Sequence, residues 1–533
     1  MERTKHVDFL VLGSGIAGLR AAITLAEAGK VLILNKGEFA ESTTRHAYSG
    51  VAAAIGEDDE VALHLRDTLR AGDGLCREEA VRILVEGGPQ EIRQLLDWGG
   101  HGEGKKPRLV LERESPNRVS PVLRAQGEPV GVEILRILAA KVRSTPAIET
   151  RSNALAVELL MEDGRCMGLM YLDEKTGSFK RVSARAVLLA TGGMGQIYSE
   201  TTNPPPASGD GVSLAFQAGA LLSDLEFIQF HPTVLYARDA PRLALASSLR
   251  EHGAKLRNLE LDRFMFRYHE CGELAPSDVV SRSIIMEMQR MRSDFVYLDL
   301  TGLPSELIKS RFPRLYAACL EENIDITTDL LQARPAAHYS MGGVATDLHG
   351  ATTLAGLYAA GEASASGVHG ANRLSYNSLL DGLVFGGRAA VGMIRQWGPA
   401  KLPSGSRRPA SSSSAAGESP PLSAGSGTEE ELKKAVKEIQ RLMWEKVGVV
   451  RTGKDLSAAL QKLETISVPQ PSRASRQYYE GRSILEAARL VARCASMRKE
   501  SRGAHYRSDF PLKNDAIPAQ HSYVSRESSV YFK

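Results

Sequence analysis

Three glycines near the N-terminus carry the clearest chemical signal in this sequence. They are the first, third and sixth residues of Gly13-Ser14-Gly15-Ile16-Ala17-Gly18. In dinucleotide-binding loops, the first glycine allows a tight turn, the second lets the backbone approach the pyrophosphate, and the third lets the helix pack on the strand. The alternative is a chance glycine turn. The position of this loop between an apolar run and a helical pattern favours dinucleotide binding.

The residues at the end of the next apolar run bear on which dinucleotide is bound. A typical nicotinamide site has a carboxylate there, which contacts the ribose. This chain has Asn35-Lys36 instead. The sequence therefore disfavours a simple NAD site and favours FAD as the cofactor.

The elements that must position this loop form a βαβ unit. Residues 7–12 and 31–34 are short apolar runs, and residues 17–28 between them carry apolar side chains at helical spacing. A strand, a glycine turn, a helix and a second strand in this order are typical of a doubly wound α/β sheet. Apolar runs at 186–190 and 357–360 are expected to join the same sheet.

Changes in composition divide the rest of the chain. We expect an FAD-binding domain over 1–226 and 340–397, interrupted by a capping domain over 227–339 that lacks a second phosphate loop. Residues 398–428 are rich in Pro, Ser, Gly and Ala, which predicts a flexible linker. Residues 429–510 are predicted to form a helical domain, because apolar residues recur there at helical periods. Residues 511–533 are predicted to be a tail.

Composition and charge exclude several classes of partner. The chain has 66 Lys and Arg against 63 Asp and Glu, and this net charge of +3 is too small to indicate nucleic acid or an acidic membrane surface. Its five cysteines are scattered without a CxxC pair, so neither a disulfide framework nor a metal site is expected. Neither a signal peptide nor a membrane-spanning run is expected, and we predict a cytoplasmic protein.

Several further motifs, in a fixed order along the chain, resemble those of one family. They are Ala190–Gly193, Ser208–Gly211, Glu226–Thr233, Asp278–Arg282, His338–Gly343, Gly361-Glu362, His369–Arg373 and Met497–His505. Together with the loop at 13–18 they are similar to the flavoproteins of the succinate dehydrogenase, fumarate reductase and L-aspartate oxidase group. The resemblance covers nearly the whole chain. It implies an α/β fold: a Rossmann-like FAD-binding domain with an inserted α+β capping domain and a C-terminal helical domain.

The resemblance also implies how FAD is held. Members with covalent flavin carry a histidine at the position of Thr43, and threonine cannot make that link, so we expect noncovalent FAD. His46 is expected to line the flavin pocket or pack beside it, not to serve as the attachment point. The expected cofactor contacts are Gly13, Ser14, Gly15, Ile16, Ala17, Gly18, Lys36, Thr43, Thr44, Ala47, Ser49, Gly50, Asp210, Glu362, Ser378 and Leu379. Asp210 and Glu362 both follow glycines, so helix capping or turn formation is the alternative for them.

The resemblance implies a dicarboxylate site built from Arg373, Arg282, His231 and His338. Arginine binds a carboxylate through two parallel hydrogen bonds, and a histidine ring is a rigid donor. Arg282 aligns with the family's proton donor or acceptor, although an arginine holds its proton too tightly for ordinary base chemistry. Glu114 aligns with the glutamate that faces the substrate's amino group in L-aspartate oxidases, with a solvated loop glutamate as the alternative. The implied reaction is oxidation of L-aspartate to iminoaspartate, with oxygen or fumarate as electron acceptor.

Three departures from the family pattern leave other functions open. Ala246-Ser247 replaces a Thr-Glu or Ser-Glu pair, Tyr48-Ser49 alters the flavin loop, and Ser120-Pro121 stands where arginines are usual. The alternatives are a soluble fumarate reductase or succinate-oxidising flavoprotein, and a catalytically silent flavin-binding protein. If aspartate is the substrate, the product feeds quinolinate formation in NAD biosynthesis, which predicts functional coupling to quinolinate synthase.

Overall fold

The computed structural model describes residues 4–47, 50–52, 54, 61–100, 109–112, 122–125, 129–236, 242–398, 425–514 and 519–533. Five residues singled out above, Tyr48, Ser49, Glu114, Ser120 and Pro121, lie outside these ranges. So does most of the predicted linker, residues 399–424.

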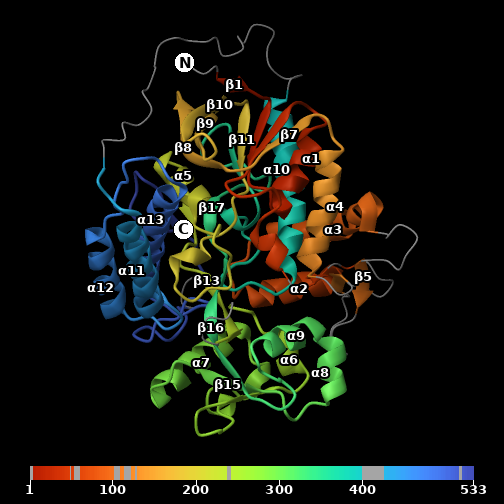
Figure 1. Ribbon diagram of the computed structural model, residues 1–533, viewed down its shortest axis with the longest axis vertical. Coiled ribbons are helices and arrows are strands. Elements are labelled where there is room, and N and C mark those ends of the chain that lie inside the picture. The colour runs from red at the N-terminus through yellow and green to blue at the C-terminus, as the bar shows by residue number, and fades with distance from the viewer. Residues whose placement is uncertain are drawn as a thin grey trace.

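A five-stranded parallel sheet forms the centre of the FAD-binding domain (Figure 1). Its order is β18-β11-β2-β3-β7, and apolar residues fill its central strands because both faces are covered. This confirms the predicted doubly wound unit and the predicted return of two later strands. The strands are β2 (Phe9–Leu12), β3 (Val31–Leu34), β7 (Ile148–Arg151), β11 (Ala186–Leu189) and β18 (Leu357–Ala359). The helices that share its core are α1 (Ile16–Leu25), α3 (Glu78–Leu95), α4 (Val130–Arg143) and α10 (Asn377–Trp397).

Two smaller sheets and two more helices also belong to this domain. One sheet has the order β1-β10-β9-β8 and the other β4-β6-β5. Their strands are β1 (Lys5–His6), β4 (Val51–Ala52), β5 (Leu109–Glu112), β6 (Val122–Ala125), β8 (Ala154–Glu162), β9 (Arg165–Asp173) and β10 (Ser178–Ser183). The helices are α2 (Val61–Ala71) and α5 (Asp210–Gln217).

The inserted segment folds around a four-stranded antiparallel sheet with its own hydrophobic core, at the lower end of Figure 1. Strands β13 and β16 carry the chain into and out of this segment and pair with each other. Because this pairing brings the two ends of the inserted segment together, we propose 227–339 as the capping domain. The strands are β13 (Ile228–Leu235), β14 (Lys255–Arg257), β15 (Val296–Asp299) and β16 (Leu331–Ser340). The helices are α6 (Ser247–Glu251), α7 (Ser277–Met291), α8 (Ser305–Arg311) and α9 (Pro313–Glu321).

The C-terminal helices pack against the FAD-binding domain. They are α11 (Glu429–Val447), α12 (Gly453–Thr465) and α13 (Arg476–Met497). Thr428 begins α11 with a capping box, in which its side chain and that of Glu431 each bond the other's backbone N–H. Side chains of these helices belong to the same hydrophobic cluster as the adjoining sheets.

The last residues correct the predicted tail. Strand β20 (Ser522–Val524) pairs with β12 (Leu222–Ser223) on one side and β21 (Tyr531–Phe532) on the other. The same sheet contains β17 (Gly343–Ala345) and β19 (Ser364–Ala365). Ser522 and Val524 are buried, because β12 offers a strand edge that the chain end fills.

The described helices include none that combines the length and the apolar composition needed to cross a membrane. All five cysteines are unpaired thiols. Within the described ranges, no three His, Cys, Asp or Glu side chains gather as metal ligands.

Candidate functional site

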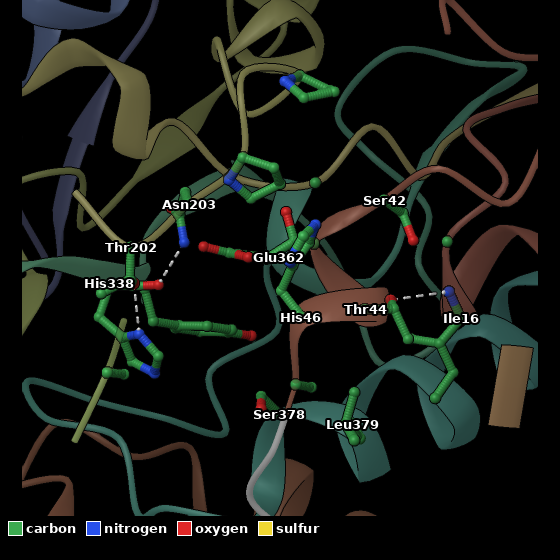
Figure 2. A pocket seen from close by; sticks show the side chains of 18 of the residues that line it. Ile16, Ser42, Thr44, His46, Thr202, Asn203, His338, Glu362, Ser378 and Leu379 are labelled. Atoms are coloured by element: carbon green, nitrogen blue, oxygen red, sulfur yellow. Dashed lines mark hydrogen bonds between the residues drawn. The ribbon is translucent and has the colours of Figure 1, made fainter. Parts of the chain in front are cut away.

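One cavity of about 1300 Å³ lies where the FAD-binding and capping domains meet. Pockets for a single small molecule usually measure roughly 300–1,000 Å³, so this cavity has room for a dinucleotide and a small substrate together. Figure 2 shows part of its lining. Most of the expected cofactor residues line it: Gly13, Ser14, Gly15, Ile16, Ala17, Lys36, Thr43, Thr44, Ala47, Asp210, Glu362, Ser378 and Leu379.

The glycine loop has the backbone geometry that a pyrophosphate requires. Gly13 has a φ of 104°, and a Cβ there would lie 2.2 Å from the Ala190 carbonyl oxygen. Gly18 does not line the cavity, but a Cβ there would lie 2.1 Å from the Gly13 oxygen, so this glycine allows α1 to pack closely. The N-terminus of α1 faces the cavity, where its free N–H groups favour an anion. The loop therefore fits the phosphates of FAD.

A second segment closes over the start of this helix. Residues Thr43–His46 form a 3-10 helix, and the Thr44 hydroxyl accepts a hydrogen bond from the Ile16 N–H at 3.3 Å (Figure 2). His46 also lines the cavity. Gly50 is buried but does not line it, and Ser49 lies outside the described residues.

A charged cluster lies just after the end of β3. The Lys36 ammonium forms an ion pair with Asp210 and another with Glu480 of α13, at 2.9 Å. It also donates to the Ser208 hydroxyl. Lys36 and Asp210 both face the cavity, and the two ion pairs of Lys36 join the end of β3 to α5 and to α13.

At the other end of the cavity, Arg373 is held from three sides. Its Nε donates to Gln229 Oε1 and its Nη1 to Ser378 Oγ, both at 2.9 Å. The guanidinium carbon lies 4.6 Å from the centre of the Tyr339 ring. Burial lowers the pKa of Arg373 from its ordinary value, but the side chain still carries its charge at neutral pH. This arrangement presents a fixed cation to a carboxylate.

Two histidines lie beside this cation. The rings of His231 and His338 are 5.3 Å apart at 68°, and both line the cavity. His338 Nδ1 is 2.8 Å from the Thr202 hydroxyl (Figure 2). His231 Nδ1 is buried without a hydrogen-bond partner among the described residues.

The two imidazoles are neutral in this arrangement. Burial, followed by the charge of Arg250, lowers the pKa of His231 to about 3. Burial, followed by the charge of Arg373, lowers the pKa of His338 well below its usual value. Each ring can therefore donate one N–H to a substrate carboxylate at neutral pH, while the positive charge comes from Arg373.

Glu362 contributes a carboxyl group to the cavity wall. Burial raises its pKa to about 7, although a hydrogen bond from the Ser340 N–H at 3.0 Å favours the ionised form. Its side chain lies over Gly193, where a Cβ would meet the carboxylate oxygen at 2.2 Å. Near neutral pH this group can hold or release a proton.

Arg282, the fourth residue of the expected clamp, does not line the cavity itself, although Gln229 and Phe230 border both the cavity and the pocket that Arg282 lines. Arg282 lines a small neighbouring pocket, and its guanidinium carbon lies 4.5 Å from the Tyr506 ring centre. The preceding residue, Ser281, donates to the Phe230 carbonyl oxygen at 2.9 Å and faces β13. Glu114 lies outside the described residues.

Some lining residues were not predicted. Gln229 and Tyr339 contact Arg373, and both lie inside the quoted motifs at 226–233 and 338–343, so the motifs could have revealed them. Nothing in the sequence indicates Thr202, which reaches His338 across the fold. Ala246 and Ser247, one of the noted departures, also line the cavity.

Comparisons with known proteins agree with this geometry. Residues 8–379 match the family described as FAD binding domain, and residues 436–532 match that described as fumarate reductase flavoprotein C-term. L-aspartate oxidase of Pseudomonas aeruginosa is 39% identical over 96% of both chains. L-aspartate oxidase of Streptomyces coelicolor is also 39% identical, over 97% of this chain and 91% of that protein. The chain belongs to the L-aspartate oxidase family. Its cofactor is FAD.

Solved structures of related flavoproteins share the whole fold of this L-aspartate oxidase family member. The quinol fumarate reductase of E. coli is 29% identical with a TM-score of 0.90, covering 100% of this chain and 96% of that one. Sdh1 of Mycobacterium smegmatis is 30% identical with a TM-score of 0.86, covering 100% and 94%. The expected arrangement of FAD-binding, capping and C-terminal domains is therefore confirmed.

Proposed function

We propose that this protein oxidises L-aspartate to iminoaspartate, the first step of NAD biosynthesis through quinolinate. The observation that carries the proposal is the meeting of Arg373, His231 and His338 in the cavity that also contains the dinucleotide loop. These residues come from three separate segments, and together they suit a dicarboxylic substrate. The curated relatives named L-aspartate oxidase support the same substrate.

When bound, FAD supplies the two-electron acceptor for the substrate's Cα–H bond. The protein's residues have the task of binding and orienting aspartate. Arg373 takes one carboxylate through its planar fork, and its position is fixed before the substrate arrives because Gln229 and Ser378 hold it. The neutral His231 and His338 donate hydrogen bonds to the substrate without adding a second charge.

We propose that Glu114 faces the substrate ammonium, because a carboxylate there would distinguish aspartate from succinate. Replacing Glu114 with Gln is expected to weaken aspartate binding more than succinate binding. Inhibition constants of succinate and KM values of aspartate, measured in parallel, check this. An equal change for both ligands would contradict the role.

We propose Arg282 as the proton donor or acceptor because it aligns with the residue that has this role in the family. In the structure it lines the pocket next to the cavity. Its replacement by Leu tests the assignment. We expect kcat to fall sharply while FAD stays bound. Undiminished turnover would remove Arg282 from the mechanism.

The second candidate is a fumarate reductase or succinate-oxidising flavoprotein. It is favoured by the shared fold with the E. coli quinol fumarate reductase and by the Arg373 and histidine arrangement, which suits any C4 dicarboxylate. A catalytically silent flavin-binding protein is the third, because Ala246 and Ser247 line the cavity in place of the usual polar pair.

Anaerobic addition of L-aspartate to the purified holoprotein decides among them. The proposal predicts that aspartate bleaches the flavin absorbance and that succinate does not. Bleaching by succinate alone would favour the second candidate, and bleaching by neither, with no fumarate turnover after dithionite reduction, would favour the third. Denaturation should release the flavin into solution, which tests the proposed noncovalent attachment.

Reoxidation of the reduced protein by oxygen or by fumarate identifies the acceptor, and oxygen should yield hydrogen peroxide. We also propose a cytoplasmic location and functional coupling to quinolinate synthase. The five free thiols suit a reducing compartment.

A further inference from the structure

Behind the Arg373 site lies a row of polar side chains, Tyr339, His369 and Asp381, that the proposed mechanism does not use. Tyr339, on β16, lines the cavity and stacks against Arg373. Its hydroxyl is 3.2 Å from His369 Nε2, and the two rings meet edge to face, with centres 5.2 Å apart. His369 and Asp381 do not line the cavity. This row of side chains therefore leads from the cavity wall into the protein interior.

Asp381, in the first turns of α10, is the last residue of this row. Its Oδ2 is 3.9 Å from His369 Nε2, and its Oδ1 accepts a hydrogen bond from Ser366 Oγ at 3.1 Å. Asp381 is 1% exposed and His369 5% exposed, so both polar groups were withdrawn from water on folding. Removing such groups from water costs free energy unless they are paired, and a role beyond filling space is therefore to be expected.

The contact of Arg373 with the Tyr339 ring depends on this row of side chains. Gln229 and Ser378 hold the guanidinium within its own plane through hydrogen bonds, whereas the Tyr339 ring lies against its face. A stacked ring attracts a cation only when the face of the ring is turned toward it. The hydroxyl contact with His369 and the edge-to-face packing restrain the rotation of that ring.

We infer that His369, supported by Asp381, is a positioning residue that acts through Tyr339 to hold Arg373 in the orientation that receives a substrate carboxylate. This inference rests on the proposed function. His369 touches neither the cavity nor a substrate within it, so its effect must pass through the Tyr339 hydroxyl.

A double-mutant cycle tests this route. The variants are Tyr339→Phe, which removes only the hydroxyl, His369→Ala, and the two combined. Each single change should raise the KM for L-aspartate about three- to tenfold, the effect of one buried hydrogen bond. The double variant should be no worse than Tyr339→Phe alone, because the two changes break the same contact. His369→Gln, whose amide can still bond the hydroxyl, should recover most of the affinity.

A matched control separates positioning from general loss of stability. His521 pairs with Asp224, and neither residue lines the cavity. His521→Ala should lower the melting temperature and leave the KM unchanged. The FAD content of all variants is measured from the ratio of flavin to protein absorbance, so that KM is compared only between loaded enzymes.

Three results would overturn the inference: an unchanged KM in His369→Ala, additive effects in the double variant, or no recovery in His369→Gln. If His369→Ala does not load FAD, His369→Leu, which fills the space but cannot bond the hydroxyl, takes its place in the cycle with the same expectations. Failure of the proposed function looks different, because the wild-type holoprotein itself would not be reduced by aspartate.

Discussion

The proposed role of Arg373 in binding the substrate carboxylate requires the planar shape of its guanidinium as well as its charge. A lysine keeps the positive charge but cannot bond Gln229, Ser378 and a carboxylate in one plane. We expect Arg373→Lys to lower kcat/KM for L-aspartate by about ten- to hundredfold, the effect of losing hydrogen bonds to a charged group. Steady-state kinetics on FAD-loaded protein checks this.

The control for this change is Arg526→Lys. Arg526 donates to the Gln217 carbonyl oxygen outside the cavity, and its replacement should leave kcat/KM unaltered. Equal kinetics for Arg373→Lys and the wild type would mean that charge alone serves the substrate.

The raised pKa of Glu362 predicts that the stability of the FAD-free protein depends on pH. Burial raises its pKa to about 7, above the ordinary value of about 4.3 that applies in the unfolded chain. The folded state therefore binds the extra proton, and this contribution to stability is full below about pH 4 and is lost as the pH rises through 7.

Removing the titration should remove that loss. Glu362→Gln is expected to lose less stability than the wild type between pH 5 and 8, as measured by melting temperatures at several pH values. Parallel curves for the two proteins would show that Glu362 is ionised throughout this range.

At the scale of elements, the turn between β2 and α1 controls cofactor binding. Gly13→Ala introduces a Cβ that would lie 2.2 Å from the Ala190 carbonyl oxygen, at a φ of 104°. The turn must then open, and the N–H groups of α1 no longer converge on the phosphates. We expect protein that retains little FAD, measured as the flavin-to-protein absorbance ratio.

Gly164→Ala is the matched control. Gly164 also has a positive φ, 74°, but a Cβ there meets nothing within 4 Å. This change should cost about 1 kcal/mol of backbone strain and leave FAD content unaltered. Flavin loss in both variants would indicate that any strained glycine destabilises the holoprotein.

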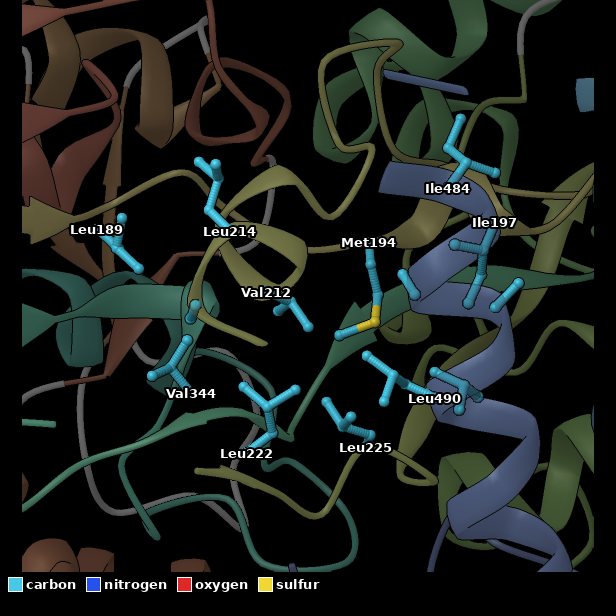
Figure 3. Close-up of a cluster of buried hydrophobic side chains, with 14 of the residues drawn as sticks. Leu189, Met194, Ile197, Val212, Leu214, Leu222, Leu225, Val344, Ile484 and Leu490 are labelled. Carbon is cyan, nitrogen blue, oxygen red and sulfur yellow. The ribbon is translucent and has the colours of Figure 1, made fainter. Parts of the chain in front are cut away.

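At the scale of the whole molecule, the helical domain and the FAD-binding domain form one core. Figure 3 shows Ile484 and Leu490 of α13 beside Met194 and Ile197 in a single cluster of buried side chains. Strand β20 contributes Val524 to the same cluster. The chain end is therefore part of the body that holds the cofactor site.

This arrangement predicts a strong effect from a charge near the C-terminus. Val524 is 3% exposed, and Val524→Asp would bury an unpaired carboxylate. We expect the melting temperature to fall by several degrees and FAD retention to drop. Leu512→Asp is the control, since Leu512 is 79% exposed and its replacement should change neither quantity.

Local pattern was sufficient to predict the phosphate loop, the parallel strands and the helical segment after residue 429. A tight glycine turn and a repeating apolar face act over a few residues, so the printed order of amino acids already contains their cause. The motif resemblance added Arg373, His231 and His338, which the fold brings into one cavity.

Contacts between distant segments could not be obtained in this way. The pairing of β20 with β12 depends on an edge that exists only after the sheet has formed, and the pocket that Arg282 lines exists only because α7 packs against β13. The support of Arg373 by Gln229, and of Tyr339 by His369, joins residues 144 and 30 positions apart. Such contacts depend on how packed elements fit together, and no short stretch of sequence specifies that fit.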